Sequence, residues 1–151
     1  MPSFDAVSYR NKRVLVVGGA TGMGAAVAEL VRDDDLWASL VSVTAELFHP
    51  SFGCAFRRFD TEKVYAGLDG LRALWLDWLA PWATYRTEID DVIDLGDRVL
   101  VLVHDFGRYD GPMEEVELPG NAIWTIRDGT IARAEFYPIR DEALKAAGLE
   151  Q

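Results

Sequence analysis

The sequence predicts an α+β fold in which helices cover an antiparallel sheet. Three apolar segments rich in β-branched residues lie in the second half of the chain, at residues 99–104, 121–126 and 130–137. Short Asp/Gly-containing segments separate the predicted strands, at residues 95–97, 109–112 and 127–129. Glycine supplies the positive φ of tight turns and aspartate bonds nearby backbone, so these breaks are typical of hairpins. Residues 84–138 are therefore predicted as a four-stranded meander, whose apolar face needs helices to cover it.

Composition narrows the class of protein. A chain of 151 residues that is 50% hydrophobic is long enough and apolar enough for one globular domain with a sizeable core. The formal net charge of −10 argues against nucleic acid or an anionic membrane surface as a partner. The single cysteine, Cys54, excludes an internal disulfide, and the apolar run at residues 14–17 is too short for a signal peptide or a membrane span. The sequence predicts a soluble, cytoplasmic protein.

Helical periodicity predicts the covering layer. Residues 36–48 have apolar side chains at helical spacing after a possible N-cap at residues 33–35, and His49-Pro50 is expected to stop this helix. A strand at 52–59 and a brief one at 64–65 precede the strongest helix, 68–82, whose stripe contains three tryptophans. That stripe either packs on the sheet or forms an aromatic binding box, and packing is the preferred interpretation. A short helix at 141–147, closed by Gly148, ends the fold.

The N-terminal segment has a different character. A strand-like run at 14–17 leads into glycines spaced as Gly18-x-x-x-Gly22-x-Gly24 and then a helix at 25–31. Residues 12–32 resemble the opening of the short-chain dehydrogenases/reductases, in which such a loop faces an anion. The chain lacks that family's second strand and its Tyr-x-x-x-Lys pair. We therefore interpret the segment as scaffolding, expect no cofactor, and keep a truncated NAD(P)-dependent reductase as an alternative.

The remainder of the chain resembles the SnoaL-like branch of the nuclear transport factor 2-like superfamily. The resemblance spans about residues 36–151 and is carried by local segments at 46–50, 65–67, 93–99, 124–129 and 136–149. It implies a curved antiparallel sheet with a mixed edge, wrapped by three to four helices into a cone that holds a pocket. It also implies a homodimer and a hydrophobic small-molecule ligand. We divide the chain into a segment at 1–33, which packs on or completes the domain, and a conical domain at 34–151.

Known members of this superfamily include polyketide cyclases, ketosteroid isomerase, epoxide hydrolases and dehydratases. Their shared chemistry is a carboxylate or histidine base in an apolar cavity. In residues 99–106, the two-residue period of a strand places Leu100, Leu102, His104 and Phe106 on one face. Val99, Val101, Val103 and Asp105 lie on the other face. Both faces are apolar in mid-strand, so the sequence does not decide which one lines the pocket.

The candidate catalytic residues are His104 and Glu135. The resemblance implies a functional acidic residue on the last strand, and Glu135 is the nearest candidate for it. The candidate substrate-binding residues all lie on the predicted strands; they are Arg133, Tyr137, Trp124, Arg86 and Asn121. A structural interpretation stands beside each: a surface salt bridge for Arg133 with Glu135, a half-buried strand histidine for His104, and a purely structural role for the other four, which could otherwise line the pocket wall. No metal-ligand spacing is present, since two distant histidines and one cysteine make no cluster.

The predicted function is that of a SnoaL-like small-molecule pocket protein. Its chemistry would be that of a cofactor-independent isomerase, cyclase or hydrolase acting on a hydrophobic substrate by general acid–base catalysis. The alternative is a non-catalytic ligand-binding or dimerisation domain of the same fold. Whether the chain is an enzyme is left open by the sequence.

Overall fold

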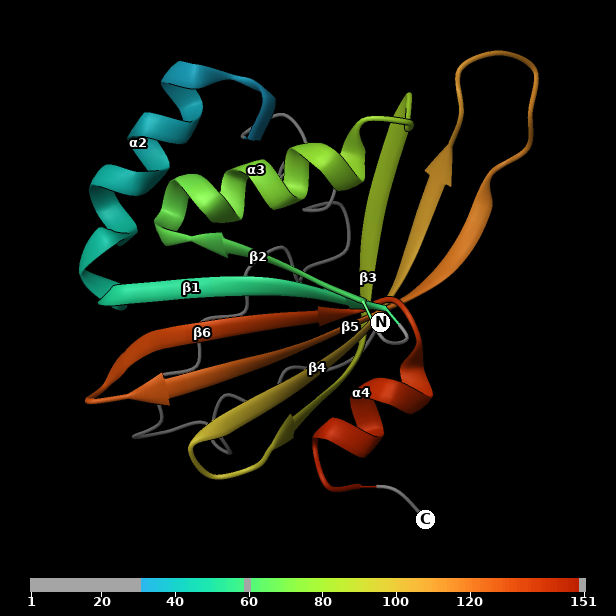
Figure 1. Ribbon diagram of the computed structural model, residues 1–151. Coiled ribbons are helices and arrows are strands. Elements are labelled where there is room, and N and C mark those ends of the chain that lie inside the picture. Colours follow the sequence, from blue (N-terminus) through green and yellow to red (C-terminus); the bar gives the residue numbers. More distant parts are fainter. Residues whose placement is uncertain (1–30, 59–60, 150–151) are drawn as a thin grey trace.

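The computed structural model describes residues 31–58 and 61–149 (Figure 1). Within these ranges the chain forms three α-helices, one short 3₁₀ helix and six strands. In chain order they are α2 (Asp34–Thr44), the 3₁₀ helix (Ala45–Leu47), β1 (Phe48–Arg58), β2 (Thr61–Ala66), α3 (Gly67–Leu79), β3 (Thr84–Asp94), β4 (Arg98–Arg108), β5 (Val116–Arg127), β6 (Thr130–Tyr137) and α4 (Arg140–Ala146). None of these helices is long and apolar enough to cross a membrane.

All six strands belong to one sheet, in the order β2-β1-β6-β5-β4-β3. Neighbouring strands are antiparallel except β1 and β6, which run parallel. The predicted meander is confirmed, because β3 to β6 follow one another in both the sequence and the sheet. Figure 1 shows α2 and α3 on one side of the sheet and α4 on the other. The α+β class with a mixed, curved sheet is therefore confirmed.

The predicted turns lie where the sequence puts them. Gly96 has φ +90° between β3 and β4, and Gly129 has φ +75° between β5 and β6. Asp128 precedes Gly129 with φ +54°, so both central residues of this hairpin adopt positive φ. This is the geometry of a type I′ turn, which suits the twist of the flanking strands and explains the Asp-Gly pair.

The first described helix begins as its capping chemistry predicts. The Asp33 carboxylate accepts hydrogen bonds from the backbone N–H groups of Asp35 and Leu36, at 2.9 Å each. The expectation that His49-Pro50 stops this helix is wrong, because α2 ends at Thr44 and Pro50 lies inside β1. The strand tolerates the proline because the register between β1 and β6 shifts between Phe48 and Gly53, where regular pairing is interrupted.

The main core lies between α3 and the sheet face that we call the inner face. On β4 the inner face carries Val99, Val101, Val103 and Asp105; Val99 and Val101 pack in one cluster with Leu71 and Leu74 of α3. Around them Trp75 meets Phe136 edge-to-face with ring centroids 6.4 Å apart. Full burial of each large apolar side chain contributes about 1.5–3 kcal/mol. These contacts support the packing interpretation of the tryptophan-rich helix.

The opposite sheet face, which we call the outer face, carries Leu100, Leu102, His104 and Phe106 of β4. Its apolar half is covered by α4, where Ala143 and Ala147 pack with Leu100. Gly148 closes α4 with φ +78°, and its N–H donates to Lys145 O at 3.0 Å. The predicted C-terminal glycine cap is confirmed.

Residues 31–33 connect the predicted N-terminal segment to the domain. Val31 is buried in a cluster with Trp37 and Leu79. The Arg32 guanidinium donates to the carbonyl oxygens of Leu79 at 2.9 Å and Trp82 at 3.1 Å, where α3 has ended. The Leu79 carbonyl also accepts the backbone N–H of Trp82 at 3.0 Å, so Arg32 adds a second hydrogen bond where the helix ends. The predicted strand, glycine loop and most of the predicted helix at 25–31 lie outside the described residues.

Candidate functional site

Asp105 places a carboxyl group on the otherwise apolar inner face of β4. The strand alternates, so Asp105 continues the row formed by Val99, Val101 and Val103. The residue is 7% exposed. Buried carboxyl groups are rare unless they are paired or have a function, because burial penalises the charged form.

Neutral hydroxyl donors hold this carboxyl. Thr87 lies opposite Asp105 in the β3–β4 pairing, and its hydroxyl donates to Asp105 Oδ1 at 2.7 Å. Tyr85 lies two residues before Thr87 on the same face of β3, and it also forms a side-chain hydrogen bond with Asp105. The Tyr85 hydroxyl in turn accepts a hydrogen bond from Trp78 Nε1 of α3 at 2.6 Å. The helix and two strands thus supply a continuous chain of donors that ends at the carboxyl.

A glycine on β5 makes room for the carboxyl group. A Cβ atom at Gly120 would lie 2.6 Å from Asp105 Oδ2 and 2.5 Å from Val103 Cγ2. Real Cβ atoms do not approach neighbours this closely, so any side chain here would have to displace the carboxyl or the valine. Gly120 therefore acts as a positioning residue for Asp105.

The environment changes the proton affinity of both acids in this cluster. Burial raises the pKa of Asp105 above its ordinary value, while the hydrogen bonds from Tyr85 and Thr87 and the charge of His104 oppose that rise. Burial, and secondarily the charge of Asp105, raises the pKa of Tyr85 far above its ordinary value. Tyr85 therefore remains a neutral donor, and the Asp105 carboxyl is moved toward the range where it can both take and release a proton.

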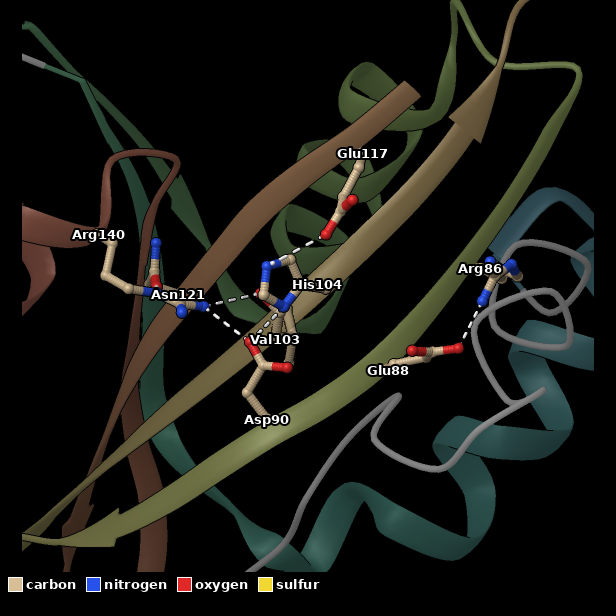
Figure 2. A network of polar contacts seen from close by, with 8 residues as sticks. All are labelled: Arg86, Glu88, Asp90, Val103, His104, Glu117, Asn121 and Arg140. Atoms are coloured by element: carbon tan, nitrogen blue, oxygen red, sulfur yellow. Dashed lines mark hydrogen bonds and ion pairs between the residues drawn. The ribbon is translucent and has the colours of Figure 1, made fainter. Parts of the chain in front are cut away.

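His104 lies on the outer face, in the polar network shown in Figure 2. Its Nδ1 is 2.5 Å from Asp90 Oδ2, and its Nε2 is 3.4 Å from Glu117 Oε1. Arg140 reaches the same Asp90 oxygen at 3.1 Å and donates to Asn121 Oδ1 at 3.0 Å. The His104 side chain is 35% exposed. The network therefore joins two predicted site residues, His104 and Asn121, through charged partners at the surface.

Glu135 lies elsewhere on the outer face. It is 2.9 Å from Arg57 Nε and 3.4 Å from Arg133 Nε, and it accepts a hydrogen bond from the Tyr137 hydroxyl at 3.2 Å. Burial and the charge of Glu135 raise the pKa of Tyr137 to about 12. The predicted grouping of Arg133, Glu135 and Tyr137 is present, and Arg57 is an additional member that the sequence did not indicate.

The remaining two predicted residues lie on different faces. The Arg86 guanidinium lies 3.8 Å from the centre of the Phe106 ring and pairs with Glu88 at 2.6 Å, on the outer face. Glu88 is the cross-strand partner of His104 in the β3–β4 pairing, although no dashed contact joins the Arg86–Glu88 pair to His104 in Figure 2. Trp124 is buried on the inner face, where it meets Phe136 edge-to-face with centroids 5.8 Å apart. Of the seven predicted site residues, Trp124 is thus the one on the inner face, and the functional roles of all seven stay predictions.

Sequence reasoning missed Asp105 and its partners Thr87, Tyr85 and Trp78. A signal for Asp105 was available, since it is the one ionisable residue in a row of valines on β4. No comparable signal identified Thr87 or Tyr85, because their role depends on the pairing of β3 with β4. Among the described residues, no group of three His, Cys, Asp or Glu side chains is arranged to hold a metal ion.

Comparison with protein-family models matches residues 25–134 to the SnoaL-like domain. The chain therefore belongs to the SnoaL-like family. The match begins at residue 25, the first residue of the helix predicted at 25–31 and nine residues before the boundary predicted at residue 34. It lends no support to a dehydrogenase-like segment. A search of curated proteins found no significant match.

Solved structures agree on the fold. A protein assigned as a SnoaL-like polyketide cyclase from Jannaschia sp. CCS1 is 21% identical, with a TM-score of 0.52 over 73% of this chain and 80% of its own. A nuclear transport factor 2-like protein of unknown function from Burkholderia pseudomallei is 16% identical, with a TM-score of 0.54 over 78% and 92%. TerC, co-crystallised with polyporic acid, is 19% identical, with a TM-score of 0.51 over 64% and 76%. At these identities the likeness shows the fold alone.

Proposed function

We propose that this protein binds a hydrophobic small molecule against the inner face of its sheet and that Asp105 transfers a proton to or from it. The reaction class is a cofactor-independent isomerisation, cyclisation or hydrolysis. The observation that carries the proposal is the Asp105 carboxyl, which is buried on an apolar face and is held by hydroxyl donors. Family membership adds support, since similar folds include an assigned polyketide cyclase and a protein crystallised with polyporic acid.

The proposed proton transfer uses the ionised carboxyl as a base. Asp105 takes a proton from a carbon next to a carbonyl group; the C–H electron pair forms the C=C bond, and the carbonyl π electrons move to oxygen. The protonated carboxyl then returns the proton to the same or another carbon. A raised pKa favours this role, because a base is most effective when its pKa lies near the working pH. Tyr85 and Thr87 orient the carboxyl throughout.

Proton abstraction can be tested without knowledge of the natural substrate. The probe is 2-tetralone, an aromatic ketone with acidic α-protons, and the readout is the loss of its α-proton NMR signals in D₂O. We expect the wild-type protein to accelerate exchange above the buffer rate, and Asp105→Asn to reduce that acceleration by about 100-fold or more.

Matched variants on the outer face serve as controls. His104→Gln and Glu135→Gln each remove an ionisable group outside the inner face. Both should exchange 2-tetralone protons at a rate close to that of the wild type, since His104 is the smallest of the influences on the pKa of Asp105. A wild-type protein that fails to accelerate exchange would contradict the proposal. Loss of exchange in His104→Gln or Glu135→Gln, with Asp105→Asn unaffected, would instead support the two residues that the sequence favours.

A non-catalytic ligand-binding domain is the second candidate. The observation that favours it is aromatic packing on the inner side of the sheet, where Phe56 lies 5.7 Å from Trp78 and Trp75 lies 6.4 Å from Phe136. Rings that fill the space next to the sheet reduce the room for a substrate. Under this candidate, 2-tetralone would bind with no acceleration of exchange.

Assembly and compartment complete the proposal. We propose a homodimer formed through the outer face, on the strength of the family resemblance, and sedimentation that gives a monomer mass would contradict it.

For the compartment we propose the cytoplasm, because a reducing environment suits the one cysteine of the chain, which is a free, buried thiol. The alternative of a truncated reductase depends on the predicted glycine loop. If the fluorescence of NADPH does not change when the protein is titrated into it, this alternative is wrong.

A further inference from the structure

Trp82 lies at the far end of the inner face, just beyond α3. It is 7% exposed. Its ring covers Gly107 so closely that a Cβ atom there would clash with the six-membered ring of the indole. It stacks on Tyr109 with centroids 4.5 Å apart and lies 6.1 Å from the Tyr85 ring. The indole is thus fixed from several sides.

The polar atom of this indole has no partner. Trp82 Nε1 is buried and donates no hydrogen bond within the described part of the chain. An indole N–H is a donor only, and buried donors in proteins are almost always paired. An unpaired donor held this firmly is a place where a ligand acceptor would gain a hydrogen bond without displacing a protein group.

The Trp82 indole ring and the Asp105 carboxyl lie against the same face of the sheet. Gly107, which Trp82 covers, is two residues from Asp105 on the same side of β4, a separation of about 7 Å along the strand. Tyr85 bridges the two, since it bonds Asp105 and packs against Trp82. A ligand that lies along this part of the inner face would be near both the Trp82 indole and the Asp105 carboxyl.

We infer that the Trp82 N–H donates a hydrogen bond to a carbonyl oxygen of the ligand, and that the carbon next to that carbonyl faces Asp105. The inference rests on the proposed function and deepens it, because it names carbonyl compounds as the ligand class. A neutral donor suits this role, because it bonds the ketone oxygen and bonds it more strongly when that oxygen becomes negative on proton removal.

The test uses the indole N–H signals in ¹H–¹⁵N spectra of the full chain. The chain has five tryptophans, and the Trp82 signal is identified by its absence in Trp82→Phe. The probes are 2-tetralone and tetralin, which share a ring skeleton and differ in the carbonyl. We expect the Trp82 proton signal to move downfield with 2-tetralone and to show no such movement with tetralin. If the chemical shift of the Trp82 proton does not change when 2-tetralone is added, the inference is overturned.

Affinity gives a second readout with a matched control. Trp82→Phe keeps an aromatic ring and removes the N–H, so it should weaken 2-tetralone binding by about tenfold and leave tetralin binding unchanged. Trp37→Phe removes another unpaired buried N–H, in the cluster of Trp37 with Val31 and Leu79, and should change neither affinity. Equal binding of 2-tetralone by Trp82→Phe and wild type overturns the inference.

The two proposals can fail separately. If Asp105→Asn abolishes exchange while Trp82→Phe binds 2-tetralone normally, the proposed function stands and the carbonyl contact is wrong. If the Trp82 signal moves with 2-tetralone but no exchange is accelerated, the carbonyl contact stands and the proposed proton transfer is wrong.

Discussion

Asp105 and His104 are neighbours in β4, yet the fold gives them opposite surroundings. Asp105 points to the inner face, where it is 7% exposed and its hydrogen-bond partners are hydroxyl groups. His104 points to the outer face, where it is 35% exposed and its partners are carboxylates. Polar contacts close to the surface are weakened by water and salt, whereas burial raises the pKa of the Asp105 carboxyl. The difference explains why the inner residue is the better candidate for chemistry.

The largest expected effect on stability comes from filling the space beside Asp105. Gly120→Ala should destabilise the protein by about 1–3 kcal/mol, because the added Cβ would press on Val103 and on the carboxyl. Gly53→Ala is the control, since its Cβ would meet Tyr65 O at an ordinary 3.5 Å. Urea unfolding measures both. Equal stability of the two variants would show that the inner face is not tightly packed around Asp105.

A smaller loss of stability is expected from removing the contacts of Arg32 with the end of α3. Arg32→Met should cost about 1–2 kcal/mol, because it removes two partly buried hydrogen bonds, to the carbonyl oxygens of Leu79 and Trp82. Arg98→Met is the control; it removes a single bond from an exposed guanidinium to Ala146 O in α4. Thermal unfolding that shifts less for Arg32→Met than for Arg98→Met would argue against a structural role for residues 31–33.

The pH dependence of stability should report the burial of the Asp105 carboxyl. The fold raises the pKa of Asp105 above its ordinary 3.8, so above that pH the folded chain retains a proton that the unfolded chain has lost. Stability from this group is fully present below the unfolded pKa and is lost as pH rises through the folded pKa. Asp105→Asn should therefore gain stability relative to wild type as pH rises, measured by urea unfolding at several pH values.

A second substitution sharpens this prediction. The Thr87 hydroxyl lowers the pKa of Asp105, so Thr87→Val should raise it further and extend the pH-dependent loss of stability to higher pH. If Asp105→Asn instead lost stability relative to wild type as pH rose, the folded protein would stabilise the charged carboxyl, and the raised pKa of Asp105 would be contradicted.

The smallest effect is expected on the outer face. His104→Gln removes contacts to Asp90 and Glu117 that are partly exposed, so the cost should stay below about 1 kcal/mol. High salt should shrink it further, because exposed charge pairs are screened. A loss above that of Gly120→Ala, unchanged at high salt, would reverse the ranking of the two faces.

Local sequence signals were enough for most of the fold. The Asp128-Gly129 pair, the Asp33 cap and the terminal Gly148 each mark an element boundary that the structure confirms. Pro50 misled the interpretation, because a proline is compatible with a strand where the register to the next strand shifts. The candidate site was less predictable, since Thr87 and Tyr85 reach Asp105 only through the pairing of β3 with β4.

The sequence by itself determined that β4 has two faces and which residues share each one, because alternation in a strand is a property of the backbone. It also determined the class of fold, through the order of strands, turns and helices. The tertiary structure alone decided which face lies under α3 and which receives α4, because both faces are apolar in mid-strand and burial depends on what packs against them. The proposed function follows from that decision, because it assigns the chemistry to Asp105 on the inner face, one residue beyond His104.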